Sequence, residues 1–302
     1  MPVTDLTGPG PVRDGAVPKD LPSGNVSSGA LSSGLDVLDA PAAPAVPSLL
    51  RRAVTKATAP VLALVFVLVA WQLAAVSGLI PRLPSPAAVL AELAGQARGG
   101  TLLPALGRSL GRAASGFAAS VLVGAPLGLL VYRIGAARTV LAPVLSAFQS
   151  LPAAALVPLA VVAFGESERA VYAVVLLGAV PSLAMGVVSA FDQVPVLLRR
   201  AGRTMGATGL LAVRHVLVPA ALPGLIVALR QGWTFGWRAL MTAELITATP
   251  LPGVGRILDA GKQQGSFALV LASVALILAI GVLVEAGVFR PVEKRVLRRR
   301  GL

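Results

Sequence analysis

FALVLASVALILAIGVLVEAGVF, residues 267–289, contains a single charged side chain, Glu285. Its apolar residues form a continuous block and show no amphipathic period, which indicates that lipid surrounds the segment on every side. A helix of this length reaches across a bilayer core of roughly 30 Å. The stretch therefore predicts a membrane-spanning helix, and a search outward from it finds others.

Five further blocks are also long enough to span a bilayer. They cover residues 60–80, 113–132, 141–164, 170–191 and 222–246. We expect all six blocks to be helices, because a helix satisfies its own backbone hydrogen bonds in lipid. The predicted fold class is therefore all-α, a polytopic membrane protein with about six transmembrane helices.

The composition agrees with a membrane protein and excludes several other classes. Hydrophobic residues make up 56% of the 302 residues, charged residues 13%, and the formal net charge is +13. The basic residues lie between apolar blocks without interleaved aromatic residues, so we expect no nucleic-acid partner. Cysteine is absent and His215 is the only histidine. We therefore expect no thiol chemistry, no metal site and no cofactor.

The N-terminal 48 residues differ from the rest of the chain. They are rich in Gly, Pro, Ser and Ala and show no sustained apolar period, which is typical of disorder. The first apolar block begins near Pro60, too far into the chain for the core of a cleaved secretory signal. We predict a disordered cytoplasmic tail over residues 1–48 and a membrane domain over residues 49–302.

The flanking basic residues predict the orientation. Connections after alternate spans are rich in Lys and Arg, and the richer side is cytoplasmic in most membrane proteins. We therefore place both termini in the cytoplasm of a bacterium, with the chain crossing its plasma membrane several times. The basic residues expected inside are Arg51, Arg52, Lys56, Arg133, Arg138, Arg199, Arg200, Arg203, Arg214, Arg290, Lys294, Arg295, Arg298, Arg299 and Arg300. Those expected outside are Arg82, Arg98, Arg108, Arg112, Arg169, Arg256 and Lys262.

Two connections carry helix signals of their own. Ser85 and Pro86 suit the N-cap and first position of a short helix outside the membrane. Between spans four and five, a cytoplasmic loop of about residues 192–221 contains LLRRAGRTMGATGLLAVRHVLVPAALPG, residues 197–224. Its apolar residues recur at helical spacing up to Gly206, which can stop a helix in the left-handed conformation.

A second helix then begins near Thr208, and Pro219 and Pro223 would kink the entry to span five. The residues alone leave two interpretations of the loop. It could be an ordered helix-turn-helix that projects from the membrane, or a basic loop that lies on lipid head groups.

The same loop resembles the EAA signature of permease subunits in ABC importers. That pattern is Glu-Ala-Ala, three residues, Gly, nine residues, Ile, one residue, then Leu-Pro. The matching positions here are Arg200, Ala201, Gly202, Gly206, Val216, Val218 and Pro219. Spacing is kept throughout, while Arg200 replaces the acid and Gly202 replaces the second alanine.

Further stretches are similar to the sulfonate, taurine and nitrate branch of these permeases. They are LPSPAAVLAEL (83–93), SLGRAASGF (109–117), Leu151-Pro152, Pro158-Leu159, Phe164-Gly165, Trp237, Ala243-Glu244 and Gly253-Val254-Gly255. Gln149 stands where relatives often have arginine.

The resemblance implies a type I, MetI-like importer fold and a particular assembly. We expect a homodimer of permeases, two cytosolic ATPase subunits and an extracytoplasmic solute-binding protein, carrying a small anion by alternating access. It also implies which residues contact the ATPase. They are Arg200, Ala201, Gly202, Met205, Gly206 and Pro219.

Spans three and five are the candidates for lining the translocation pathway. Pro143, Pro152 and Pro158 should bend or break span three, and irregular backbone is tolerated beside a cavity or when buried in protein. Span five carries two ionisable residues, which are costly in lipid unless they face water or a partner. The tentative pathway residues are Gln149, Pro152, Trp237, Arg238 and Glu244. Simple kinked packing, with Glu244 as an acid at the interface, is the alternative.

The chain lacks a phosphate-binding loop of the form GxxxxGK[ST], so we expect no enzymatic activity and a separate ATPase. An ion-coupled secondary transporter and a non-transporting membrane scaffold are the rival functions. Pairs of glycines four apart, Gly124 with Gly128 and Gly232 with Gly236, predict close helix packing.

Overall fold

The computed structural model describes residues 49–78 and 80–298, so the tail predicted over residues 1–48 lies outside the described part. The chain divides into two compact units, Met1–Ala63 and Leu64–Leu302.

The described residues form helices and turns with no strand, which confirms the predicted all-α class. In chain order the helices are α2 (Leu49–Val76), α3 (Pro86–Arg98), α4 (Leu102–Arg133), α5 (Gly135–Ser150), α6 (Ala153–Phe164), α7 (Glu168–Asp192), α8 (Val196–Thr204), α9 (Gly209–Ala212), α10 (Val218–Ile246), α11 (Val254–Gln263), α12 (Phe267–Val284) and α13 (Arg290–Arg298). Two π-helical turns, Val213–Leu217 and Glu285–Phe289, join α9 to α10 and α12 to α13.

The predicted count of six spans is matched only roughly. Within the described residues, four helical segments are long and apolar enough to cross a membrane: 102–133, 168–192, 209–246 and 267–298. The predicted second span was too short, because α4 begins at Leu102 and carries Arg108 and Arg112 inside the helix.

The predicted third span is broken. Helices α5 and α6 meet at a bend of 104° at Leu151 and Pro152, and Pro143 and Pro158 lie within the two halves. Proline at position 152 removes a backbone donor and disfavours helical geometry in the residue before it. The first predicted span contributes only the shorter apolar stretch Val61–Val76.

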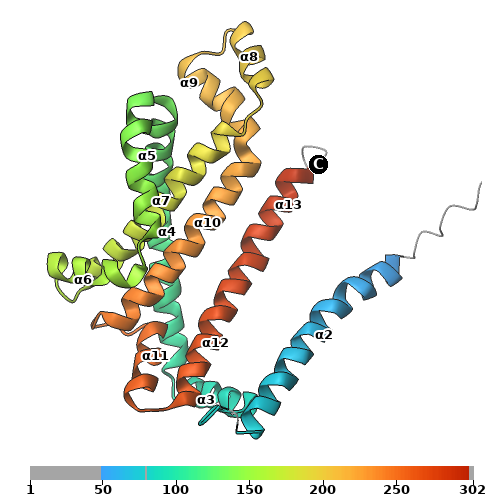
Figure 1. The fold of residues 1–302 in the computed structure, drawn as a ribbon, viewed down its shortest axis with the longest axis vertical. Helices are drawn as coiled ribbons and strands as arrows, with labels where there is room; N and C mark the ends of the chain where they lie inside the picture. Colours follow the sequence, from blue (N-terminus) through green and yellow to red (C-terminus); the bar gives the residue numbers. More distant parts are fainter. Residues whose placement is uncertain (1–48, 79, 299–302) are drawn as a thin grey trace, which may run out of the picture. The chain divides into compact units, whose positions relative to one another are not determined.

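Helix α7 lies at the centre of the second unit, packed against α4 on one side and α10 on another (Figure 1). The predicted glycine pairs make both contacts. A Cβ on Gly128 would lie 2.5 Å from the carbonyl oxygen of Ala184, and one on Gly232 would lie 2.3 Å from Cγ of Leu183. The prediction that these glycines serve close packing is confirmed.

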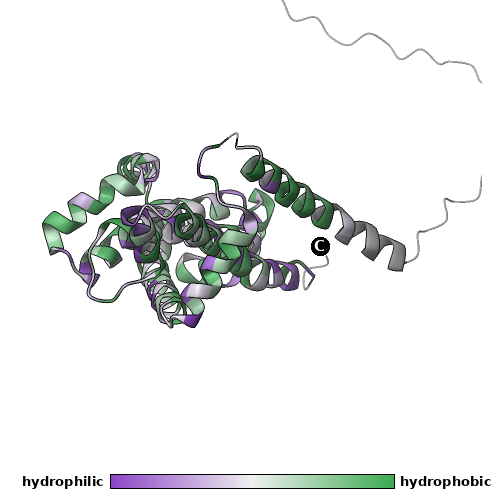
Figure 2. Cartoon of the chain, turned by 90° about the horizontal axis from the view of Figure 1, so that it is seen from below, coloured by the Kyte–Doolittle hydropathy of each residue, from purple (hydrophilic) through white to green (hydrophobic). Residues whose placement is uncertain are grey.

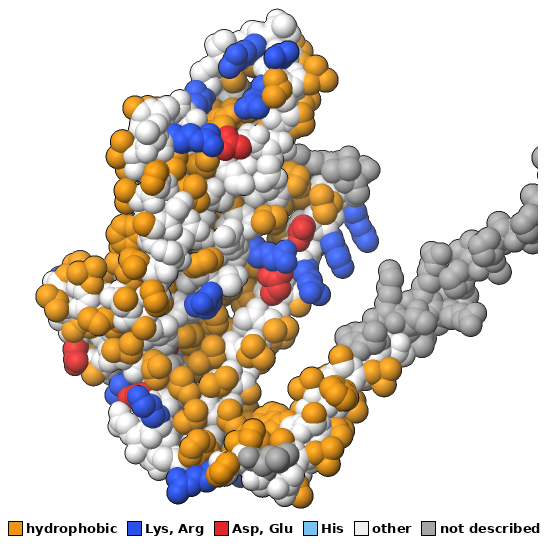
Figure 3. Space-filling view, in the orientation of Figure 1, with side chains coloured by type: hydrophobic (Ala, Val, Ile, Leu, Met, Phe, Trp, Pro, Cys, Tyr) orange, Lys and Arg blue, Asp and Glu red, His pale blue; other side chains and the backbone are white. Residues whose placement is uncertain are grey.

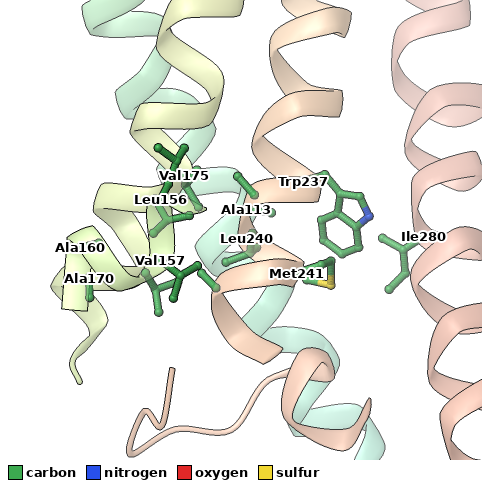
Figure 4. Close-up of a cluster of buried hydrophobic side chains, with 14 residues drawn as sticks. Ala113, Leu156, Val157, Ala160, Ala170, Val175, Trp237, Leu240, Met241 and Ile280 are labelled. Atoms are coloured by element: carbon green, nitrogen blue, oxygen red, sulfur yellow. The ribbon is translucent and has the colours of Figure 1, made fainter. Parts of the chain in front are cut away.

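A cluster of buried hydrophobic side chains fills the space between α4, α6, α7, α10 and α12 (Figure 4). Val171 and Val174 on α7 and Leu240 on α10 are fully buried within it. Because α6 contributes Leu156 and Val157, this cluster also holds the second half of the broken span in place.

Hydrophobic residues predominate along the long helices (Figure 2), and outside this core their side chains remain exposed (Figure 3). Val162 on α6 is 87% exposed and Leu122 on α4 is 76% exposed. Exposed apolar surface on this scale is expected where the solvent is lipid. At the start of α3, Ser85 Oγ caps the helix by accepting from Ala88 N at 3.2 Å, as predicted.

The helices of the second unit define two ends in Figure 1. The α8 end comprises α8, α9 and the junction between α4 and α5. The α11 end comprises α3, α11 and residues 247–253, which join α10 to α11. Helices α4, α7 and α10 run from one end to the other.

Candidate functional site

The turn after α8 is closed by backbone hydrogen bonds around a left-handed glycine. Gly206 has φ +81°, its N–H donates to Arg203 O at 3.0 Å, and Ala207 N donates to Gly202 O at 2.9 Å. This pair of bonds is a Schellman motif, which satisfies the last carbonyls of a helix. The next helix, α9, begins after Thr208. The predicted helix, glycine turn and second helix are therefore confirmed.

Gly202 explains one departure from the EAA pattern. It is the buried residue of α8, and a Cβ there would lie 2.9 Å from Cγ2 of Val216. Absence of a side chain thus allows α8 to pack directly on the π-helical turn that leads into α10. Arg200, the other departure, is exposed.

Two arginines fix the loop to the helices beneath it. Arg133, at the end of α4, donates to Gly209 O at 2.6 Å, and Arg199 donates to the hydroxyl of Tyr132 at 3.4 Å. Lys and Arg side chains gather over this end in Figure 3.

The remaining predicted coupling residues surround an open groove. Ala201, Met205 and Pro219 line a cavity of about 490 Å³, together with Leu198 and His215. Met205, directly after α8, is 80% exposed, and Leu197 on α8 is 77% exposed. The apolar face of α8 is therefore directed away from the subunit, where it can meet another surface.

Three of the five predicted pathway residues come together at the break in span three. Gln149, Pro152 and Arg238 line one cavity of about 390 Å³, beside Phe235 and Gly178. The break itself supplies the ends of α5 and α6 to the wall of this cavity. Their role in transport remains a prediction.

Arg238 is the cationic group of that cavity. Its side chain is exposed and its guanidinium lies 5.8 Å from the centroid of the Phe235 ring. Among the described residues, no carboxylate pairs with it. A guanidinium at this depth in a span is stable only when it faces water or an anion.

Trp237 and Glu244 lie elsewhere. Trp237 points from α10 towards Ile280 of α12 in Figure 4 and stacks on Trp233, with ring centroids 6.2 Å apart. Glu244 is fully buried and pairs with Arg112 on α4, 2.9 Å away. Glu244 therefore pairs with a residue of another helix and not with Arg238, its neighbour on α10.

The partners of Glu244 were not foreseen from the sequence. Ser109 and Arg112 lie one turn apart on α4 and both reach its carboxylate. Arg112 also pairs with Glu168, at the start of α7. The only sequence signal was the stretch SLGRAASGF, which contains Ser109 and Arg112 but assigns neither a partner.

Comparison with known proteins places these features in a family. Residues 116–297, more than half of the chain, match the family described as "Binding-protein-dependent transport system inner membrane component". The chain belongs to this family. The permease is therefore an inner membrane component of a transport system, and its resemblance to ABC permeases is confirmed.

Relatives of the permease are named for several different substrates. It is 32% identical over 200 residues to the taurine transport system permease protein TauC of Escherichia coli K12, covering 66% of this chain and 70% of that protein. It is 30% identical over 209 residues to the nitrate import permease protein NrtB of Synechocystis, covering 66% and 74%. The bicarbonate transport system permease protein CmpB of Synechococcus elongatus is 27% identical over 231 residues, covering 72% and 82%.

Solved structures agree with the fold of the permease. A chain of the MetNI methionine ABC transporter in an inward-facing conformation aligns with a TM-score of 0.55 at 25% identity, covering 65% of this chain and 95% of that one. The predicted MetI-like fold is therefore confirmed.

Proposed function

We propose that this chain is the membrane-spanning permease subunit of an ATP-driven importer that carries a small anion by alternating access. Membership of the binding-protein-dependent family supports a transport role. The relatives named for taurine, nitrate and bicarbonate support a small solute that carries a sulfonate, nitrate or carbonate group.

The proposal that the solute is an anion rests on Arg238, whose unpaired guanidinium lies in the cavity at the α5–α6 break. Guanidinium presents planar donors that match the oxygens of a sulfonate, nitrate or carbonate group. Gln149 adds an amide that can donate to the same oxygens. Phe148, Leu151 and Phe235 add apolar surface to the wall, which strengthens such contacts by lowering the local dielectric.

The α8 end supports coupling to a separate ATPase. Its exposed apolar groove, lined by Ala201, Met205 and Pro219, offers a surface that a cytosolic subunit could cover. We propose that Arg200, Gly202 and Gly206 complete this contact within a coupling loop of residues 192–221. The full assembly would hold two permease copies, two ATPase subunits and an external binding protein, with residues 49–302 as the permease domain and 1–48 as a cytoplasmic tail.

Reconstituted transport tests the proposal. The chain, the ATPase and the binding protein encoded beside it are placed in proteoliposomes, and uptake of labelled taurine, nitrate and bicarbonate is measured with and without ATP. We expect ATP-dependent uptake of one of these. Arg238→Gln should lower uptake at limiting substrate by about tenfold, the loss of about 1.4 kcal/mol. Arg214→Gln is the matched control, because Arg214 is exposed at the α8 end.

Other outcomes separate the rival functions. Uptake driven by an ion gradient without ATP would identify a secondary transporter. Retained binding of the ATPase without uptake of any solute would favour a scaffold. Equal uptake by Arg238→Gln and wild type would remove the anion role of the cavity.

Orientation has its own test, because the chain contains no cysteine to give background labelling. We expect Ser167→Cys to react with a membrane-impermeant thiol reagent from outside, and Thr208→Cys to react only after permeabilisation. Both termini would then be cytoplasmic. Labelling of Thr208→Cys from outside would reverse the orientation.

A further inference from the structure

Arg112 uses its whole guanidinium to join three segments at the α11 end. Nε donates to Glu168 at 2.7 Å, NH1 donates to Glu244 at 2.9 Å, and NH2 donates to the carbonyl oxygen of Leu251 at 2.6 Å. NH2 also pairs with Glu168. The side chain is only 5% exposed. One residue on α4 is thus bonded to the start of α7, the end of α10 and the turn after α10.

Glu244 is held from its other side as well. Ser109 Oγ donates to the carboxylate at 2.7 Å and accepts from Val254 N at 2.9 Å, while Gly255 N donates to Glu244 at 3.1 Å. A Cβ on Gly253 would lie 2.3 Å from Glu244 Oε2. The turn between α10 and α11 is therefore folded against this carboxylate.

Glu168 differs from the other members of the cluster, because it is 35% exposed and lies in the first turn of α7. An acid is favourable there next to the positive end of the helix dipole. It directly follows Ser167, and Gly165, with φ +71°, leads back from there to α6. Glu168 therefore connects Arg112 to the second half of the broken span.

The three helices bonded by Arg112 extend to the α8 end. Helix α10 follows the α8–α9 loop directly through the π-helical turn Val213–Leu217. Arg133, at the far end of α4, donates to Gly209 of the same loop. The loop is therefore joined to the Arg112 cluster along two continuous helices.

We propose that Arg112 is a positioning residue that makes the α11 ends of α4, α7 and α10 move together. Displacement of the α8–α9 loop is then passed to the α6–α7 turn, and so to the α6 wall of the Arg238 cavity. This proposal rests on the proposed transport function. A buried pair that merely stabilised the fold would not require the second, half-exposed acid on α7.

This positioning role depends on the planar set of donors in the Arg112 guanidinium, because lysine carries the same charge but lacks that set. Arg112→Lys keeps a cation beside Glu244 and should fold, yet it cannot bond Glu168, Glu244 and Leu251 O at once. Glu168→Gln removes the α7 contact and leaves the Glu244 pair in place. Glu166→Gln makes the same change two residues away at an exposed acid, and Arg98→Lys does so at an exposed arginine of α3.

The test measures geometry and coupling separately. Spin labels at Arg169→Cys on α7 and Ala248→Cys after α10 report the distance between the two segments in the purified subunit. We expect a narrow distribution in wild type, Glu166→Gln and Arg98→Lys, and a broadened one in Glu168→Gln and Arg112→Lys. In proteoliposomes, solute taken up per ATP hydrolysed should fall at least about threefold in the latter two variants.

Unchanged distance distributions and unchanged uptake per ATP in both Glu168→Gln and Arg112→Lys would overturn the proposal. Broadened distances with normal coupling would also overturn it, because the cluster would then be structural only. If wild type itself shows no ATP-dependent uptake, the proposed function fails, whereas the distance measurement still tests whether Arg112 joins the segments.

Discussion

The α8 end and the α11 end of the subunit are built in opposite ways. At the α8 end, the apolar face of α8 is exposed, and the loop is held by backbone turns and by two arginines bound to partly exposed groups. At the α11 end, Glu244 is fully buried, and Arg112, Ser109 and the backbone N–H of Gly255 satisfy its carboxylate. One end is open to a partner, and the other is closed on itself.

This difference teaches where substitutions act on stability and where they act on association. Polar groups buried in a network are costly to leave unpaired, so changes at the α11 end should destabilise the subunit. Exposed groups at the α8 end contribute little to folding, so changes there should act on binding of the ATPase. Four comparisons between variants can break or sharpen this contrast.

Arg112→Ala should have the largest effect. It leaves Glu244 buried without its cation, a change that costs about 3–5 kcal/mol in known buried pairs. We expect poor yield and a markedly lower thermal midpoint in detergent, measured by tryptophan fluorescence. Arg214→Ala, at the exposed α8 end, should match wild type. Equal stability of the two variants would refute the view that the buried network at the α11 end stabilises the fold.

Ala201→Glu should have the next largest effect, and it should affect only the association with the ATPase. If α8 docks in a groove of the ATPase, a buried unpaired carboxylate there costs several kcal/mol. We expect normal insertion and thermal midpoint with loss of ATPase co-purification and uptake. Leu210→Glu on α9 places the same charge at a position that is 77% exposed and should retain both. A loop resting on lipid predicts normal uptake for Ala201→Glu as well.

Gly206→Val tests the turn that aims α8. Its φ of +81° is strained for a β-branched residue by about 1–2 kcal/mol. We expect an inserted protein with weakened ATPase binding, measured by co-purification. Gly100 has φ +73° in the turn before α4, so Gly100→Val carries comparable strain away from α8. Equal ATPase binding by both variants would show that the Gly206 turn does not position the contact.

Ser109→Ala and Tyr132→Phe form the smallest and most direct comparison. Each removes one hydroxyl from a hydrogen bond to a charged group. Ser109→Ala removes a donor from the buried Glu244 and an acceptor from Val254 N. This loss should lower the free energy of unfolding by about 1–3 kcal/mol. Tyr132→Phe loses a 3.4 Å contact with Arg199 and should cost about 0.5 kcal/mol or less. Denaturation of both purified proteins measures the difference.

The sequence predicted well those features that depend on local chemistry. Apolar blocks require helices in lipid, and the spacing of Gly206, Thr208 and Pro219 requires a turn between two helices, so both were confirmed. The glycine pairs on α4 and α10 were also foreseen as packing contacts, because only small residues permit backbones to approach so closely.

The sequence could not predict the cluster around Arg112. Ser109, Glu168 and Glu244 are joined only by the tertiary fold, because 135 positions separate the serine from Glu244. Hydropathy also placed Arg112 outside the second span, since a charge normally ends an apolar block. Its partners make that charge tolerable within the helix. The sharp bend at Pro152 was foreseen, but its angle of 104° depends on the packing of Leu156 and Val157.

The exposure of Leu197 on α8 and of Met205 directly after it has a consequence for the amount of this protein in the cell. If the α8 end faces the cytoplasm, as proposed, Leu197 and Met205 present apolar surface there while no partner covers them. A surplus copy made without its ATPase would therefore expose apolar surface of the kind that chaperones and proteases recognise. Assembly would cover this apolar surface, so the proposed coupling helix would also help to keep the amounts of the two subunits in balance.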